Sequence, residues 1–272
     1  GSAVVSADGA GGLAVASDYF AWDMHTDFAS AAYPPTSKTT DAFIPSFMVR
    51  RTTQTGAVVS TPLVVQNLSG NGITLQPHDL VLTCKAAPLS GYSDFNAYNT
   101  SPINDNATYS FNPVTDTGSF PVTGWYGSCR LQTNNPAKQF IVMAQIRYPA
   151  NQKAAAYEAI RAGGTDYQAF FPTIKKRVTA GEAGTVATSV FVQNLGNSPA
   201  TAYFYYASHC PGFNNIPGFT ETIPVGQSVN HNHRLQSTLA QQMPDGWCGS
   251  LRVVANQPID GFAQVTTLEE PS

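Results

Sequence analysis

The sequence predicts an all-β protein built from two tandem β-sandwich domains. An internal repeat and a regular spacing of short β-prone segments carry this prediction. Residues 65–68 read Val-Gln-Asn-Leu, and the same four residues recur 127 positions later at 192–195. The same offset aligns residues 43–45, Phe-Ile-Pro, with residues 170–172, Phe-Phe-Pro. Several matches in one order indicate an internal duplication, and therefore two copies of one domain.

Short β-prone segments follow one another in both copies, which predicts an immunoglobulin-like sandwich in each. The segments are rich in Val, Thr, Tyr and Phe, and turns such as Asn-Gly, Pro-Gly and Asn-Gln-Pro separate them. Strands at spacings of about 8–15 residues are typical of such sandwiches. We expect strands at 43–50, 58–66, 79–84, 126–133 and 140–147, and then at 170–178, 185–193, 200–208, 219–223, 228–233, 249–255 and 261–267.

The N-terminal segment has no counterpart in the second copy. Residues 1–17 contain no aromatic residue and one charge, Asp8, and their larger apolar residues are Val4, Val5, Leu13 and Val15. Such a segment cannot fold alone, so we expect an extended strand that adds to the edge of a sheet, its own or a neighbour's. The expected division is an N-terminal extension at 1–20, a first repeat at 21–148 and a second repeat at 149–272.

Two further segments depart from the repeat. In 151–162 an Ala-rich stretch follows Asn151, which can cap a helix, and precedes Gly163, which can end one. We therefore expect a short helix that connects the two domains. In the first copy, residues 86–119 replace a short Pro-x-Gly-x-Ser turn of the second copy, and we expect a long insertion there.

The composition narrows the classes of function. Charged residues make up 11% of the chain and the net charge is −3, with no basic stripe, so we expect no nucleic-acid partner. The 42% of hydrophobic residues suffices for a core. No apolar run approaches the roughly 20 residues of a membrane span, so we expect none.

The four cysteines divide two per copy and allow three pairings. The repeat favours Cys84–Cys129 and Cys210–Cys248, and free buried thiols are the alternative. Cys129 lies four residues after Trp125, whereas Cys248 directly follows Trp247, so the two bridges should not superpose. Disulfides indicate an oxidising, and therefore secreted or cell-surface, location.

These motifs resemble tandem β-sandwich repeats of secreted and cell-surface proteins of filamentous bacteria. The shared features are an aromatic-x-Pro entry strand, a Val-Gln-Asn-Leu-Gly strand end at 192–196, an aromatic strand at 203–206, Asp245-Gly246 before a Gly-Ser pair, and a final Gln-Pro-Ile at 257–259. The resemblance covers about 42–148 and 169–268. It implies an extracellular building or spacing module without known catalysis.

Catalytic signatures are absent from the sequence, which has no G-x-S-x-G, H-E-x-x-H or Gly-rich phosphate motif, and we expect neither an enzyme nor a cofactor. His231 and His233 alternate along an expected strand and could face one metal ion, with His209 elsewhere. Two ligands do not make a metal site, so ordinary surface imidazoles are the preferred interpretation.

Sugars enter the predictions in two ways. Asn99, Asn106 and Asn67 begin N-glycosylation sequons. Asn67 is the weakest of these, because its counterpart Asn194 does not begin a sequon. A role in a turn explains both asparagines, since Asn tolerates a left-handed backbone and its side chain can bond its own backbone. Trp125 and Trp247 could stack on sugars, but their equivalent positions favour core packing. The better sugar-binding candidates are Tyr92, Phe95, Tyr98 and Tyr109.

We therefore expect a structural subunit of an extracellular assembly, such as a filament, pilus-like fibre, sheath or surface layer. Its partner would be a second copy of itself, joined head to tail through the N-terminal segment. The alternative is a carbohydrate-binding or adhesin module that uses 86–119.

Overall fold

The computed structural model divides the chain into two compact units, Gly1–Ala162 (unit 1) and Gly163–Ser272 (unit 2). Each is considered by itself. Every regular element among the described residues is a β-strand, and these residues form no helix long and apolar enough to cross a membrane. The structure describes residues 17–22, 28–33, 38–52, 56, 58–88, 90–116, 118–121, 124–148, 153–161, 166–179, 185–234 and 243–267.

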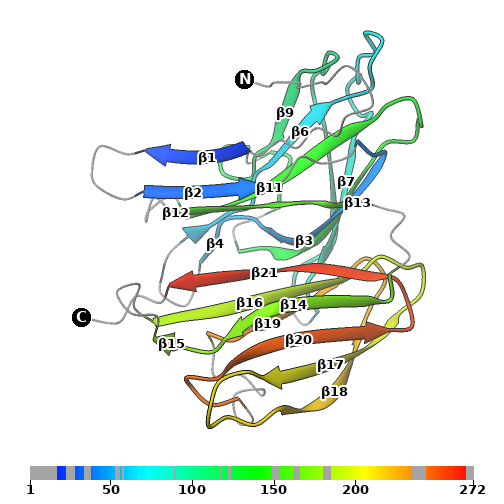
Figure 1. Ribbon diagram of the computed structural model, residues 1–272. Helices are drawn as coiled ribbons and strands as arrows, with labels where there is room; N and C mark the ends of the chain where they lie inside the picture. Colours follow the sequence, from blue (N-terminus) through cyan, green and yellow to red (C-terminus); the bar gives the residue numbers. More distant parts are fainter. Residues whose placement is uncertain are drawn as a thin grey trace, which may run out of the picture. The chain divides into compact units, whose positions relative to one another are not determined.

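Unit 1 contains two larger antiparallel sheets (Figure 1). The first has the order β13-β3-β10-β7-β8, with bounds Ile160–Arg161, Asp41–Met48, Tyr126–Gln132, Val81–Ala86 and Phe95–Tyr98. The second has the order β12-β11-β6-β9, with bounds Lys153–Glu158, Phe140–Tyr148, Leu63–Asn67 and Thr108–Phe111. Two small hairpins complete the unit: β1 (Ser17–Trp22) with β2 (Phe28–Tyr33), and β4 (Arg51–Thr52) with β5 (Val58–Val59).

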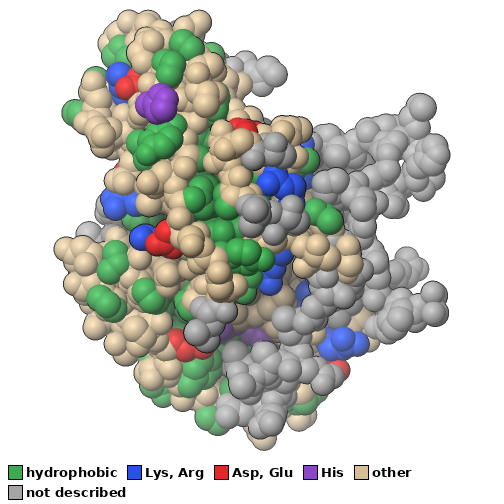
Figure 2. All heavy atoms as spheres, turned by 180° about the vertical axis from the view of Figure 1, so that it is seen from behind, with side chains coloured by type: hydrophobic (Ala, Val, Ile, Leu, Met, Phe, Trp, Pro, Cys, Tyr) green, Lys and Arg blue, Asp and Glu red, His purple; other side chains and the backbone are tan. Residues whose placement is uncertain are grey.

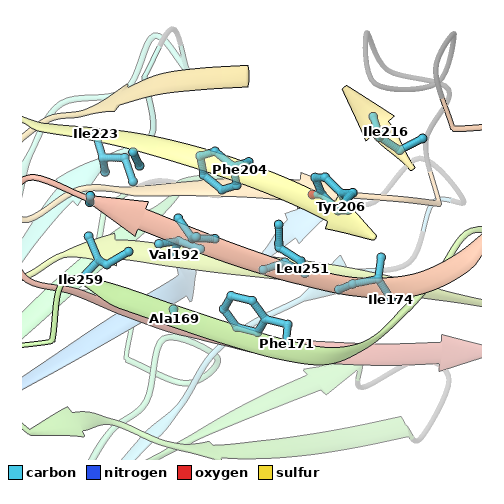
Figure 3. Close-up of a cluster of buried hydrophobic side chains, with 14 of the residues drawn as sticks. Ala169, Phe171, Ile174, Val192, Phe204, Tyr206, Ile216, Ile223, Leu251 and Ile259 are labelled. Carbon is cyan, nitrogen blue, oxygen red and sulfur yellow. The ribbon is translucent and has the colours of Figure 1, made fainter. Parts of the chain in front are cut away.

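Unit 2 repeats this arrangement in its own two sheets. One has the order β14-β20-β17-β18, with bounds Gln168–Lys175, Cys248–Ala255, Ala200–Ser208 and Ile216–Ile223. In the other, β16 (Thr185–Asn194) pairs with β15 (Val178–Thr179), β19 (Ser228–Asn232) and β21 (Ile259–Thr267). Figure 3 shows core side chains from both sheets of unit 2 pointing toward one another, among them Phe171, Val192, Phe204 and Leu251.

The two units share one strand order. The path β3-β10-β7-β8 of unit 1 corresponds to β14-β20-β17-β18 of unit 2, and β11-β6-β9 corresponds to β21-β16-β19. A register shift also recurs at the same place, opposite Gly127 in unit 1 and opposite Gly249 in unit 2. The internal duplication seen in the sequence is therefore also a duplication of topology.

The strand order of unit 2 differs from that of an immunoglobulin constant domain. There the first strand shares a sheet with the second, and the last lies in the sheet of the sixth. If the two-residue β15 is left out of the count, the first strand of unit 2, β14, pairs with the sixth, β20, and the last strand, β21, pairs with the second, β16. The two-sheet architecture was predictable, but the first and last strands have exchanged sheets, and the fourth strand, β18, lies beside the third, β17.

Residues 86–119 are not an insertion. They contain β8 and β9, which occupy the positions of β18 and β19 in unit 2. Each of the two strands has only four residues, and backbone hydrogen bonds to β7 and β6 hold them in place. Because backbone pairing places few demands on side chains, the two copies diverged in sequence here while the strands remained.

The predicted helix at 151–162 is wrong, because residues 153–158 form β12 and residues 160–161 form β13. β12 pairs with β11 and β13 with β3, so the segment completes both sheets of unit 1. Alanine has the highest intrinsic helix propensity, but this preference amounts to less than about 1 kcal/mol per residue, and pairing with two available sheet edges overrides it. The sequence-based boundary at 148/149 accordingly falls between two strands that pair with each other.

Candidate functional site

The two equivalent asparagines, Asn67 and Asn194, have a structural role, because their buried side chains form hydrogen bonds with backbone groups. Neither Asn67 nor Asn194 has a left-handed backbone, so of the two turn roles considered, the side-chain bond is the correct one. Asn67 is fully buried; its Nδ2 donates to the carbonyls of Ile73 and Ile103 at 2.8 and 2.9 Å, and its Oδ1 accepts from Ser69 N at 3.0 Å. A glycan on Nδ2 would replace one of its two hydrogens, so at least one of the donated bonds would be lost, and it would have to be attached at a fully buried atom.

The other two sequons differ in accessibility. Asn99 is fully buried, and its Nδ2 donates to the carbonyls of Gln76 and Ser101 at 2.8 and 3.0 Å. Glycosylation of Asn99 therefore stays a prediction, and the burial of its side chain in the folded chain argues against it. Asn106 is exposed and has a φ of 65°, which places it in a left-handed turn. Of the three predicted residues, only Asn106 keeps any solvent access.

Both repeat tryptophans belong to the cores. Trp125 and Trp247 are fully buried, and their Nε1 groups donate to the carbonyls of Ser93 and Asn214 at 2.9 and 3.0 Å. They are not available as sugar-stacking platforms.

The four aromatic residues of 86–119 do not form one binding face. Phe95 stacks edge-on against Trp125 at 4.8 Å, within the core, and Tyr92 packs against Tyr126. Tyr98 lies on the outer surface beside His78, whereas the Tyr109 hydroxyl accepts a hydrogen bond from Thr100 N. The sequence signal for a sugar-binding loop therefore came from residues with separate packing roles.

The disulfides pair as the repeat predicts, Cys84 with Cys129 and Cys210 with Cys248. Cys84 and Cys129 lie directly opposite each other on β7 and β10 and are buried. Cys210 follows the end of β17, and Cys248 begins β20 and is half-buried. The two bridges therefore occupy different positions in their units, and leucine and tyrosine replace the buried cysteine pair in unit 2: Leu251 lies opposite Tyr206.

His231 and His233 lie on one side of β19 and its extension, but both rings point into unit 2 rather than to solvent. His231 Nδ1 lies 2.8 Å from the Tyr206 hydroxyl, and His231 Nε2 lies 3.1 Å from Glu221 Oε2. His233 Nδ1 donates to the Thr188 carbonyl at 2.7 Å, and His233 Nε2 lies 3.2 Å from the same Tyr206 hydroxyl. The expectation of surface imidazoles is therefore wrong.

This cluster is not arranged as a metal centre. All four ring nitrogens already have protein partners, and among the described residues no group of three or more His, Cys, Asp or Glu side chains could hold a metal ion. His209 is exposed and contacts Ser250 instead. Figure 2 shows the charged side chains of one face scattered in small groups.

We expect unit 2 to lose stability between pH 6.5 and pH 4 because of His233. The pKa of His233 is lowered to about 4, mainly by burial and in smaller part by the charges of His231 and Lys176. The unfolded chain binds this proton near pH 6.5, so the stabilisation is complete above that pH and is lost as the pH falls toward 4. Across this window, urea unfolding should show that the free energy of unfolding falls by about 3 kcal/mol more in the wild type than in His233→Gln. An equal loss in the variant would contradict the assignment.

The strongest candidate for a binding site is one side of unit 2 that lacks a strand present in unit 1. In unit 1, β12 pairs along β11 and β13 along β3. In the described part of unit 2, no strand occupies the corresponding positions beside β21 and β14. We call this β14–β21 side the open side of unit 2.

Equivalent residues show what is missing at the open side. Phe43 of β3 is 3% exposed, whereas its repeat counterpart Phe170 of β14 is 66% exposed. Ile146 of β11 is 1% exposed, whereas its counterpart Val265 of β21 is 47% exposed. In unit 1 the backbone of Ile160 on β13 lies opposite Phe43, and that of β12 lies opposite Ile146. The same hydrophobic positions are thus covered in one unit and open in the other.

Tyr157 fastens the additional strand of unit 1. It lies opposite Ala144 in the β12–β11 register, and its buried side chain reaches the bulged part of β3. Its hydroxyl donates to the Ser46 carbonyl at 2.5 Å and accepts from Ser46 N at 3.3 Å. The repeat counterpart of Ser46 is Thr173, which is exposed on β14. The open side of unit 2 therefore retains the backbone to which such an anchor could bind.

The predicted assembly residues Val4, Val5, Leu13 and Val15 lie outside the described residues. Residues 17–20, assigned to the extension from the sequence, belong to β1 and pair with β2. No protein-family model, curated protein or solved structure matches this chain. The resemblance to repeats of filamentous bacteria thus remains an expectation.

Proposed function

We propose that the chain is a structural subunit of an extracellular assembly that grows by strand addition to the open side of unit 2. The observation that supports this proposal is the contrast between Phe43 and Ile146, which are buried, and Phe170 and Val265, which are exposed at the same repeat positions. Exposed sheet edges with apolar neighbours favour pairing with another chain. The two disulfides are compatible with an oxidising extracellular location.

The added strand would be residues 1–16 of a second copy. This segment is rich in Ala, Gly and Val, and β12, which fills the equivalent place in unit 1, contains the run Ala154-Ala155-Ala156. Small residues allow a strand to lie close to a neighbouring sheet, while Val and Leu can cover exposed apolar positions. Because the donor and acceptor surfaces are different, the contact is head to tail and can continue into a filament.

We expect Phe170→Asp with Val265→Asp to abolish self-association, because two charges would be desolvated beside the added strand. Deletion of residues 1–16 should have the same effect, and sedimentation velocity over a range of concentrations measures both. Val225→Asp is the matched control, since Val225 is 43% exposed in the turn between β18 and β19, away from the open side. Unchanged assembly in the double variant, or a wild-type chain that stays monomeric at high concentration, would refute the proposal.

A peptide with the sequence of residues 151–162 gives an independent test. It carries the strand that covers the equivalent positions in unit 1, including Tyr157, and should compete for the open side. We expect the peptide to inhibit assembly of the wild-type chain. A peptide with Tyr157→Ala should inhibit it less, because it lacks the hydroxyl that bonds to the backbone of β3.

Carbohydrate binding is a second candidate function, at a different place from the predicted 86–119 loop. Tyr203 and Tyr205 project from the outer face of β17 with ring centroids 4.3 Å apart, and Tyr205 is 47% exposed. Adjacent exposed aromatic rings with nearby polar side chains suit the apolar face of a sugar. Retention on insoluble polysaccharide that is lost in Tyr205→Ala would support this function, and equal retention would exclude it.

A further inference from the structure

The Tyr206 hydroxyl lies between two imidazole nitrogens and has one hydrogen to donate. It can therefore donate to His231 Nδ1 or to His233 Nε2, but not to both. The ring that does not receive this hydrogen must donate its own to the hydroxyl oxygen. Each ring also has a fixed partner at its other nitrogen: the Thr188 carbonyl for His233 and the Glu221 carboxylate for His231. While Glu221 is a carboxylate, all four contacts are satisfied only if one of the rings carries hydrogen on both nitrogens.

The surroundings of the two rings decide which one holds the additional proton. His231 faces Glu221 of β18, whose side chain is 36% exposed, and packs against the uncharged rings of Phe204 and Phe219. His233 is buried, and its pKa is lowered to about 4, mainly by burial and also by the positive charge of Lys176. Asp245, which pairs with Arg177, partly offsets the effect of Lys176. The proton therefore belongs on His231.

We propose that the Glu221–His231–Tyr206–His233 chain is a proton-dependent lock that joins the two sheets of unit 2. Glu221 and Tyr206 belong to the sheet of β17 and β18, whereas His231 belongs to β19 in the other sheet. His231 donates from Nε2 to Glu221 and from Nδ1 to the Tyr206 oxygen, and Tyr206 donates to His233 Nε2. When the proton on His231 is lost, one buried nitrogen faces an oxygen without a hydrogen between them. A buried acceptor without a partner destabilises the fold, and the edge strand β19 should be the part that loosens.

Unit 1 has no such lock at this position. The repeat counterpart of Tyr206 is Cys84, which is covalently bonded to Cys129. The pH-dependent loosening should therefore occur in unit 2, while unit 1 acts as an internal reference. This inference does not depend on the proposed assembly, since it concerns the two sheets within one unit.

The test combines ring nitrogen NMR with amide hydrogen exchange on the full chain. Long-range ¹H–¹⁵N correlations should show His231 with both nitrogens protonated near pH 6.5, and His233 as the neutral Nδ1–H tautomer. When His231 loses its proton at higher pH, protection factors of β19 amides should fall about tenfold, the change expected for one buried hydrogen bond. Amides of β6 in unit 1 should keep their protection, and exposed His78 and His209 serve as reference rings.

Tyr206→Phe removes the hydroxyl that requires the proton, so β19 protection should no longer fall when the pH is raised. If this variant does not fold, Glu221→Gln replaces the test, because it removes the carboxylate at the partly exposed end of the chain and should leave His231 neutral near pH 6.5. Two neutral rings in the wild type at that pH, an additional proton on His233, or β19 protection that does not change when His231 deprotonates would each overturn the lock.

Discussion

Replacement of Gly249 by alanine should lower the free energy of unfolding of unit 2 by about 4 kcal/mol. A Cβ at this position would overlap the carbonyl oxygen of Ala207 and lie 2.5 Å from Cη2 of the buried Trp247. The oxygen belongs to the backbone of the paired strand β17 and cannot move without breaking that pairing. The ring cannot move either, because its Nε1 is bonded to Asn214 in the core. Denaturant unfolding with tryptophan fluorescence measures the effect.

Gly226→Ala is the matched control for this experiment. Gly226 has a φ of 70° but nothing within 4 Å of its added Cβ, so alanine there costs only the strain of a left-handed backbone, about 1 kcal/mol. Gly127→Ala should repeat the large effect in unit 1, since its Cβ would overlap the Lys85 carbonyl oxygen. If Gly249→Ala is no worse than Gly226→Ala, close packing of the tryptophan on the glycine is not the reason for the Trp-x-Gly spacing.

The parts of the fold that could be predicted from the sequence are those fixed by short-range spacing. The Trp-x-Gly pair and the Val-Gln-Asn-Leu strand end recur because each side chain acts on backbone close to it in the fold, and both units place them identically. The strand segments were visible for the same reason, because alternation and turn residues are local. The cysteine pairing followed from the duplication.

The parts that could not be predicted depend on pairing between distant segments. Residues 153–158 have a helical composition, and only the free edge of β11 makes them a strand. β8 and β9 escaped detection because four-residue strands carry almost no periodic signal. The exchange of β14 and β21 between sheets has no local signature either.

The sequence did not reveal the candidate sites, because they depend on which side chains the tertiary fold buries. His231 and His233 were expected at the surface, since two histidines in a polar stretch give no sign that Tyr206 lies opposite them. The open side of unit 2 needed a comparison of equivalent positions, because Phe43 and Phe170 are identical in sequence and differ only in what covers them.

Asn194→Ala should destabilise unit 2 by about 3–4 kcal/mol, because it leaves several buried backbone groups without partners. The side chain is fully buried, and its Nδ2 donates to the carbonyls of Ser198 and Ile223 at 2.8 and 2.9 Å, while Oδ1 accepts from Gly196 N at 2.9 Å. These bonds join the end of β16 to the following loop and to the end of β18, so no neighbouring group can replace them. Exposed Asn197→Ala is the control and should change the unfolding free energy by less than about 0.5 kcal/mol.

Asn67→Ala should have the same effect on unit 1, since Asn67 bonds to Ile73, Ile103 and Ser69 in the same pattern. Asn67→Asp separates the effect of losing the donated hydrogen bonds from the effect of losing side-chain volume. It keeps the shape of the side chain but replaces the two donated hydrogens with a carboxylate oxygen that faces two carbonyls, so it should be at least as harmful as alanine. Urea unfolding of Asn194→Ala, Asn67→Ala and Asn67→Asp, compared with the wild type, measures these changes in the free energy of unfolding. If Asn67→Asp unfolds at the same urea concentration as the wild type, the donated bonds do not hold the strand end, and the conserved geometry of the two repeats would need another cause.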